Sequence, residues 1–307
     1  MRTKLLLAAG LLLLSTAMVE DPEAPPPAGV QHWVECGSKR LSLWERRPPE
    51  HARSPARVVL FLHGATWSGR PNFDLSHPDF STMVHFAEQG WDAFCLDVQG
   101  YGNSDEPEAD NWCTAESAVR DVHAAVEFLG SECGAGPIHL IGWSWGSQVA
   151  GLYASRHPKQ VARLVLYGSQ WRPWDHPPAA PVEPFRVNSK ADAKTDFIKG
   201  CFDPAMAEAY ANEAIAADPS SPNGSLLDYI QNLPIIDPAA IDVPSMILLG
   251  EHEARHKMRD QLDLFEALPN PDKRFVIIPG GGHAVHLEHP RARWRSAVLD
   301  FFRAAPD

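Results

Sequence analysis

The sequence predicts an α/β protein built on a doubly wound, mostly parallel sheet, with a helical cap inserted late in the chain. Three observations carry this prediction. Short apolar runs, typical of strands buried on both faces, alternate with stretches whose apolar residues recur at helical spacing. A proline-rich segment, residues 169–238, interrupts that alternation. Between residues 142 and 146, an apolar run turns directly into a helical pattern, with a serine at the centre of the turn.

The composition fits one large globular unit. Of the 307 residues, 44% are hydrophobic and 21% are charged, which is enough for a deep core. The formal net charge is -12, and no run of lysine and arginine is present that could follow a phosphate backbone. We therefore expect no nucleic-acid partner.

Residues 1–17 have the layout of a secretory signal peptide. Arg2 and Lys4 precede an apolar block, and small residues follow up to Ala17, after which cleavage is expected. The apolar block is shorter than the roughly 20 residues that span a bilayer, so no stable membrane span is expected after cleavage. The sequence thus predicts a secreted or periplasmic protein, with an uncleaved N-terminal anchor or a wrongly chosen start codon as the alternatives.

Export would permit disulfides, but the five cysteines indicate no pairing pattern. Cys113 and Cys133 flank a predicted helix roughly 25 Å long, so they cannot pair with each other. The spacing of cysteines and histidines matches no metal-site pattern. We expect neither a metal nor another cofactor. The five residues are Cys36, Cys95, Cys113, Cys133 and Cys201.

Residues 18–30 are predicted to be a proline-rich linker, followed by a core of residues 31–168 and 239–307 and a cap of residues 169–238. The core is expected to open with an antiparallel hairpin. The predicted strands are 32–36, 41–46, 58–62, 91–98, 138–141, 161–167, 245–250 and 274–278. The predicted helices are 80–89, 114–130, 147–157, 191–199, 204–217, 226–233, 260–268 and 290–302.

The cap is rich in aromatic side chains, which either line a pocket or form the cap's own small core. These residues are Trp171, Trp174, Phe185, Phe197, Phe202, Tyr210 and Tyr229.

The turn at residues 142–146 is predicted to be a nucleophile elbow. Gly142 and Gly146 suit a turn so sharp that any larger side chain would collide with neighbouring backbone. Ser144 would then lie at the N-terminus of the next helix, where a developing oxyanion is stabilised. Its Oγ could attack a carbonyl carbon.

Ser144, Glu253 and His283 each follow a predicted strand, so the sequence places them at the sheet edge where α/β proteins bind ligands. The order serine, acid, histidine resembles that of the α/β-hydrolases, and the resemblance covers nearly everything from Gln31 onward. It also rests on His63-Gly64, on the loop from Gly100 to Asp105, on Gly250 to Glu253, and on Gly282-His283 with Glu288 and Pro290.

The resemblance implies a catalytic triad. His283 would take the proton of Ser144 and later protonate the leaving group, and Glu253 would orient the imidazole. Members of the superfamily more often carry aspartate at this acid position, so glutamate is a departure. Glu251 and Asp175 remain alternatives for the acid.

The resemblance also implies an oxyanion hole formed by the backbone N–H groups of Ala65 and Trp145. His63 is expected to support the oxyanion turn by hydrogen bonding. Packing or surface positions are expected for His286 and His289, and His252 is expected to be a loop residue.

These residues favour a cofactor-independent serine hydrolase that cleaves an ester or related acyl bond of a small molecule through an acyl-enzyme. A serine at the elbow disfavours haloalkane dehalogenases and epoxide hydrolases, which use a carboxylate there. The elbow is similar to that of proline iminopeptidases, so an amidase is one alternative and a carbon–carbon bond hydrolase is another. A catalytically silent binding protein with this fold is the non-enzyme alternative. The sequence leaves the substrate and the oligomeric state open.

Overall fold

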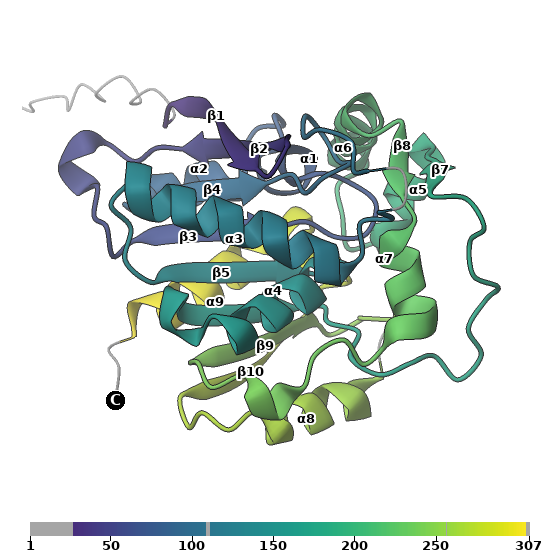
Figure 1. Ribbon diagram of the computed structural model, residues 1–307. Coiled ribbons are helices and arrows are strands. Elements are labelled where there is room, and N and C mark those ends of the chain that lie inside the picture. The colour runs from purple at the N-terminus through teal and green to yellow at the C-terminus, as the bar shows by residue number, and fades with distance from the viewer. Residues whose placement is uncertain (1–26, 109–110, 256, 305–307) are drawn as a thin grey trace, which may run out of the picture.

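A computed structural model describes residues 27–108, 111–255 and 257–304. Its centre is an eight-stranded sheet with the strand order β1-β2-β4-β3-β5-β6-β9-β10 (Figure 1). The strand β2 pairs antiparallel with β1 and β4, and every other neighbouring pair of this sheet is parallel. The predicted fold class is thus confirmed. The bounds are β1 (Gly29–Cys36), β2 (Lys39–Arg46), β3 (Val58–Leu62), β4 (Asp92–Leu96), β5 (Ile138–Trp143), β6 (Val161–Tyr167), β9 (Ser245–Gly250) and β10 (Lys273–Ile278).

Of the predicted signal peptide and linker, the structure describes only the last residues of the linker. The predicted signal peptide and most of the predicted linker lie outside the described residues. The strand β1 begins at Gly29, within the segment predicted as linker, because its first residue already pairs with Arg46 of β2.

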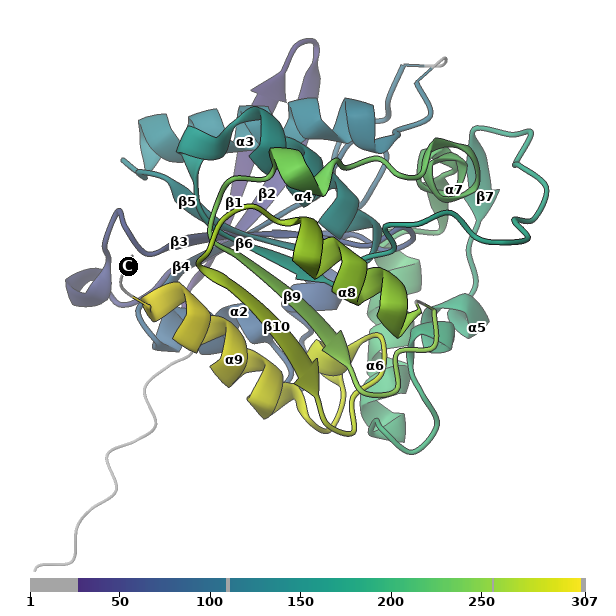
Figure 2. The same ribbon diagram turned by 90° about the horizontal axis from the view of Figure 1, so that it is seen from below.

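Helices cover both faces of the sheet (Figure 2). One face carries α3 (Ala115–Glu132), α4 (Trp145–Arg156) and α8 (Met258–Ala267), and the other carries α1 (Gly69–Phe73), α2 (Thr82–Glu88) and α9 (Arg291–Arg303). Side chains of a strand point alternately to opposite faces, so Leu60 joins one core layer and its neighbour Phe61 joins the other. The short helix α1 was not predicted.

The segment between β6 and β9 holds α5 (Lys190–Ala193), α6 (Pro204–Ala217) and α7 (Gly224–Leu227). It lies beyond one end of the sheet strands, as Figure 1 shows. The helix α6 has the predicted bounds. The antiparallel ribbon of β7 (Phe185–Val187) and β8 (Ser220–Pro222) was not predicted. We call residues 169–238 the insertion; its division from the core as a separate cap stays a prediction.

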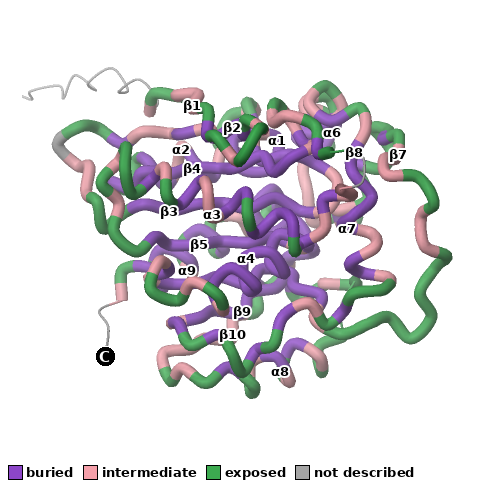
Figure 3. The backbone as a smooth tube through the Cα atoms, viewed as in Figure 1, coloured by how far each residue is buried: buried purple, intermediate pink, exposed green. Residues whose placement is uncertain are grey.

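Near its start the insertion has an exposed stretch at residues 172–179, visible as a green loop in Figure 3. Its later part packs more tightly: Phe197 and Tyr210 are buried in the core layer that contains α1 and α9. Within the described ranges, no helix is long and apolar enough to cross a membrane. All five cysteines are free thiols.

Candidate active site

Ser144 occupies the turn between β5 and α4 with φ 55 and ψ -120, a left-handed backbone that residues other than glycine rarely adopt. The flanking glycines explain how the turn fits. A Cβ on Gly142 would lie 2.2 Å from the carbonyl oxygen of Gly146, and one on Gly146 would lie 2.4 Å from that of His63. The predicted elbow geometry is therefore present, and it lifts Ser144 out of the sheet.

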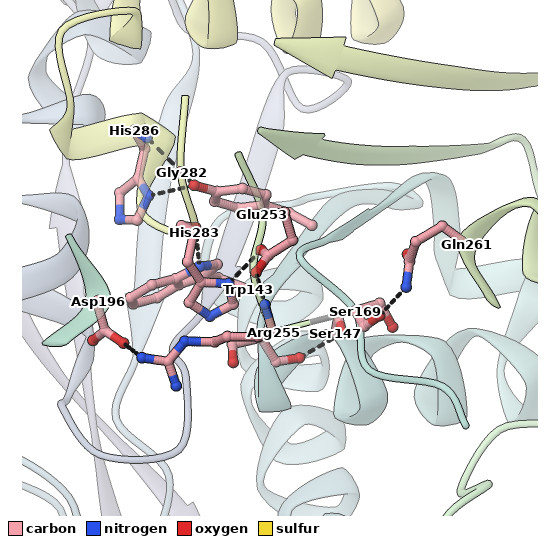
Figure 4. A network of polar contacts seen from close by, with 12 residues as sticks. Trp143, Ser147, Ser169, Asp196, Glu253, Arg255, Gln261, Gly282, His283 and His286 are labelled. Carbon is pink, nitrogen blue, oxygen red and sulfur yellow. Dashed lines mark hydrogen bonds and ion pairs between the residues drawn. The ribbon is translucent and has the colours of Figure 1, made fainter. Parts of the chain in front are cut away.

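His283 and Glu253 contact each other after the last two strands of the sheet. The Nδ1 of His283 lies 2.6 Å from Oε2 of Glu253, and their side chains are only 4% and 1% exposed (Figure 4). The two loops are joined because the backbone N–H of His252 donates to the carbonyl oxygen of Gly281 at 2.8 Å. The register of β9 beside β10 thus brings this imidazole and carboxylate together.

Gly168 leaves room for this pair, a role that the sequence did not reveal. It follows β6 with φ 57, and a Cβ there would lie 3.0 Å from Cε1 of His283 and 3.1 Å from its Nδ1. Any larger residue would push against the imidazole and would also strain the backbone. Gly168 therefore permits the close approach of β6 to His283.

The two alternative acids contact other groups. The carboxylate of Glu251 accepts a hydrogen bond from the N–H of Gly280 at 2.9 Å, and its side chain is half exposed. Asp175 is exposed in the insertion and pairs with Lys257 at 2.6 Å. Glu253 is the one of the three that the structure brings to His283, whereas the catalytic roles themselves stay predictions.

A second charged pair adjoins this site. The backbone N–H of Arg255 donates to Oε1 of Glu253 at 2.9 Å, and its guanidinium pairs with Asp196 at 2.7 Å (Figure 4). Burial raises the pKa of the Asp196 carboxyl, while the charge of Arg255 acts to lower it. Arg255 thus links the loop that carries Glu253 to the insertion.

Ser144 and His283 share a cavity of about 250 Å³ at the boundary between sheet and insertion. Of the aromatic residues in the insertion, Trp174 and Tyr229 line this cavity. A role in lining a pocket was one of the two expected for these residues. The other lining residues are Gly64, Ala65, Thr66, Trp67, Trp143, Gln170, Asp196, Leu226 and Arg255.

The predicted oxyanion residues lie at two turns. Ala65 lines the cavity, and Trp145 opens α4, where the first N–H groups of a helix lack an intrahelical partner. The carbonyl oxygen of Ala65 accepts hydrogen bonds from the hydroxyl of Tyr101 at 2.8 Å, from that of Ser225 at 3.0 Å, and from Arg186. These donors, two of them in the insertion, hold the peptide group between Ala65 and Thr66, next to the peptide group that carries the Ala65 N–H.

His63 has the supporting position expected for it. Its Nδ1 lies 2.8 Å from the carbonyl oxygen of Gly64, and its Nε2 accepts from the N–H of Val98 at 3.3 Å. Burial lowers the pKa of His63 to about 4, so the ring is neutral at physiological pH. His286 is also buried, against Tyr167, whereas His252 and His289 are exposed. Among the residues that the structure describes, no group of three His, Cys, Asp or Glu side chains could hold a metal ion.

Arg186 gives a first testable prediction. Its guanidinium reaches the carbonyl oxygen of Ala65, Oγ1 of Thr66 at 3.2 Å and the carbonyl oxygen of Pro222 at 2.6 Å. A lysine cannot reproduce this fork, so the Ala65 turn should move. We expect Arg186→Lys to lower kcat/KM of the hydrolase activity about 10- to 100-fold. Arg156→Lys, at a surface ion pair with Glu116, is the control and should stay within twofold; equal effects of the two substitutions would contradict this role.

The sheet order, the serine elbow and the adjoining histidine–glutamate pair define the α/β-hydrolase fold, and the chain belongs to the superfamily of serine hydrolases that shares it. More narrowly, residues 53–290 match the family Hydrolase_4, described as serine aminopeptidase, S33, and the chain belongs to that family.

Curated relatives match only part of the chain. An epoxide hydrolase 3 of Siraitia grosvenorii is 30% identical over 131 residues, which are 42% of this chain and 37% of that protein. A monoacylglycerol lipase of Homo sapiens is 30% identical over 109 residues, which are 35% and 29% of the two chains. The chain thus matches about a third of the length of these relatives.

Solved structures match over nearly the whole fold. An esterase from Exiguobacterium antarcticum has a TM-score of 0.66 at 16% identity, with 90% of this chain and 100% of that chain covered. An esterase from Thermogutta terrifontis has a TM-score of 0.64 at 19% identity, with 89% and 98% covered. At such identities the likeness establishes the fold alone.

Proposed function

We propose that this protein hydrolyses a carboxylic ester or related acyl bond through an acyl-enzyme on Ser144. His283 takes the Ser144 proton as Oγ attacks the carbonyl carbon, then gives that proton to the leaving group. It next takes a proton from water, whose oxygen attacks the acyl carbon, and returns it to Ser144 Oγ as the ester bond breaks. Glu253 holds Nδ1 and stabilises the imidazolium. The N–H groups of Ala65 and Trp145 stabilise the oxyanion.

One observation carries this proposal. Ser144, on a strained elbow, shares a cavity with His283, whose Nδ1 contacts the buried carboxylate of Glu253. A strained nucleophile beside an oriented base is an arrangement typical of covalent acyl transfer.

The serine also discriminates between the activities of the relatives. Attack of a carboxylate on an epoxide gives an ester that water can cleave, but attack of Ser144 would give an ether that water does not cleave. The nucleophile therefore favours the activity of the lipase- and esterase-named proteins over that of the epoxide hydrolase. The cavity of about 250 Å³ suits a small acyl substrate.

An aminopeptidase-like amidase is the second candidate because the family description names that activity. The carboxylate of Asp196 faces the cavity and could bind a substrate amine, but it pairs with Arg255 at 2.7 Å. This pairing favours the ester over the amide.

A fluorophosphonate probe tests the proposal. The folded protein should become covalently labelled, and peptide mapping should place the label on Ser144. Short-chain esters should slow the labelling more than prolyl amides do. Folded protein that stays unlabelled would favour a silent binding protein, and stronger competition by prolyl amides would favour the amidase.

We also propose that the protein is exported, on the strength of the pattern in residues 1–17. The mass of the mature protein tests this, since cleavage after Ala17 removes the signal segment. Soluble protein that retains Met1 would contradict the proposal.

A further inference from the structure

A tyrosine of the insertion contacts the proposed nucleophile. The hydroxyl oxygen of Tyr229 lies 3.2 Å from Oγ of Ser144, and Tyr229 is only 7% exposed. Trp174 packs beside it, with ring centroids 5.9 Å apart, and both residues line the cavity. Since the Ser144 proton is directed to His283 in the proposed mechanism, a lone pair of Oγ is available for Tyr229 to donate to.

A buried carboxylate next to Tyr229 holds it in place. Asp228 accepts hydrogen bonds from Nε1 of Trp145 at 2.7 Å, from the N–H of Ala115 at 2.6 Å and from Nδ2 of Asn232 at 2.9 Å. Trp145 directly follows Ser144, so the same contacts tie the turn that carries Tyr229 to the elbow. The turn, Asp228–Asn232, is π-helical, a local geometry that often occurs at functional sites.

Tyr229 is suited to donate a hydrogen bond and not to act as a base. Burial raises the pKa of its phenol well above the usual value. The hydroxyl therefore keeps its proton at any pH at which the enzyme would work.

From this contact we infer that Tyr229 is a further catalytic residue, whose hydroxyl stabilises the charge on Ser144 Oγ as the acyl-enzyme breaks down. The inference rests on the proposed function. In the acyl-enzyme, Oγ is an ester oxygen and a weak acceptor; as the bond between the acyl carbon and Oγ breaks, Oγ gains negative charge and the hydrogen bond strengthens. In the free enzyme, Oγ already accepts this hydrogen bond as a neutral hydroxyl. The bond therefore stabilises the transition state of acylation less than that of deacylation. The proton stays on Tyr229, and His283 carries the proton that returns to Oγ.

Pre-steady-state hydrolysis of p-nitrophenyl acetate tests this role. Tyr229→Phe removes one oxygen, and we expect the steady-state rate to fall about 10- to 100-fold. The initial burst of p-nitrophenol should slow much less, KM should fall together with kcat, and mass spectrometry should detect accumulated acetyl-enzyme. Tyr210→Phe is the matched control, since this buried tyrosine donates to Asn72 away from the cavity and its loss should leave both phases unchanged.

A second variant covers the case in which Tyr229→Phe does not fold. Asn232 is exposed, and Asn232→Ala removes one of the bonds that hold Asp228. It should slow deacylation severalfold and acylation less. A steady-state rate within twofold of wild type in both variants, or an equal fall of burst and steady-state rates, would overturn the role of Tyr229. If wild-type protein forms no acetyl-enzyme and takes no fluorophosphonate label, the proposed function fails as well, so the two failures are distinguishable.

Discussion

Ser144→Ala should abolish the proposed ester hydrolysis, with kcat/KM reduced at least about 1,000-fold, and should remove fluorophosphonate labelling. Without Oγ, neither the base nor the oxyanion hole can produce an acyl-enzyme, and only direct attack of water on bound substrate remains. The measurements are steady-state kinetics and labelling of purified protein. Ser155→Ala is the control: this serine lies on the same helix, α4, and its hydroxyl donates to the carbonyl oxygen of Leu152.

The backbone at residue 144 shows whether such a loss is chemical or structural. With φ 55, Ser144 has a conformation that costs about 1–3 kcal/mol for residues other than glycine, whereas glycine adopts it freely. Ser144→Gly should therefore be inactive and yet no less stable to denaturant than wild type. A Ser144→Ala protein that is folded and retains most of its activity would leave the proposed mechanism without a nucleophile.

The parts of the site that the sequence predicts are those determined by local structure. The elbow follows from two glycines around a serine between a strand and a helix, and the close contact of Gly142 with Gly146 lies within the turn itself, although Gly146 also leaves room for the carbonyl oxygen of His63. The positions of Glu253 and His283 follow from strands β9 and β10, whose apolar runs are continuous. Each of these predictions needs only the residues within one turn or one strand.

The parts that sequence reasoning missed depend on contacts between distant segments. The strands β7 and β8 have three residues each and no periodicity, so nothing predicts that Arg186 reaches Ala65. Tyr229 was one of seven aromatic residues with two possible roles, and only the packing of the insertion on the elbow distinguishes it. The need for glycine at position 168 comes from the contact between the end of β6 and His283, which lie far apart in the sequence.

Glu253→Gln should lower kcat about 1,000- to 10,000-fold while the protein stays folded. Glutamine has the size of glutamate, but it lacks the charge that stabilises the imidazolium, and its amide can orient the ring with the wrong nitrogen protonated. Glu253→Asp keeps the charge but shortens the side chain by one methylene, which stretches the 2.6 Å contact to His283, so a smaller loss of about 10- to 100-fold is expected. Steady-state kinetics over a pH series measures both variants.

The two other acids provide matched controls because the structure gives them different partners. Glu251→Gln removes charge from a group that contacts Gly280, and Asp175→Asn removes it from an exposed partner of Lys257, so both variants should keep kcat within about threefold. A large loss in Asp175→Asn with little in Glu253→Gln would mean that the loop after β6 carries the acid. Because Asp175 is exposed in the described conformation, that result would also require the insertion to move before catalysis. Comparing the four variants therefore identifies the carboxylate that stabilises the charge on His283 during turnover.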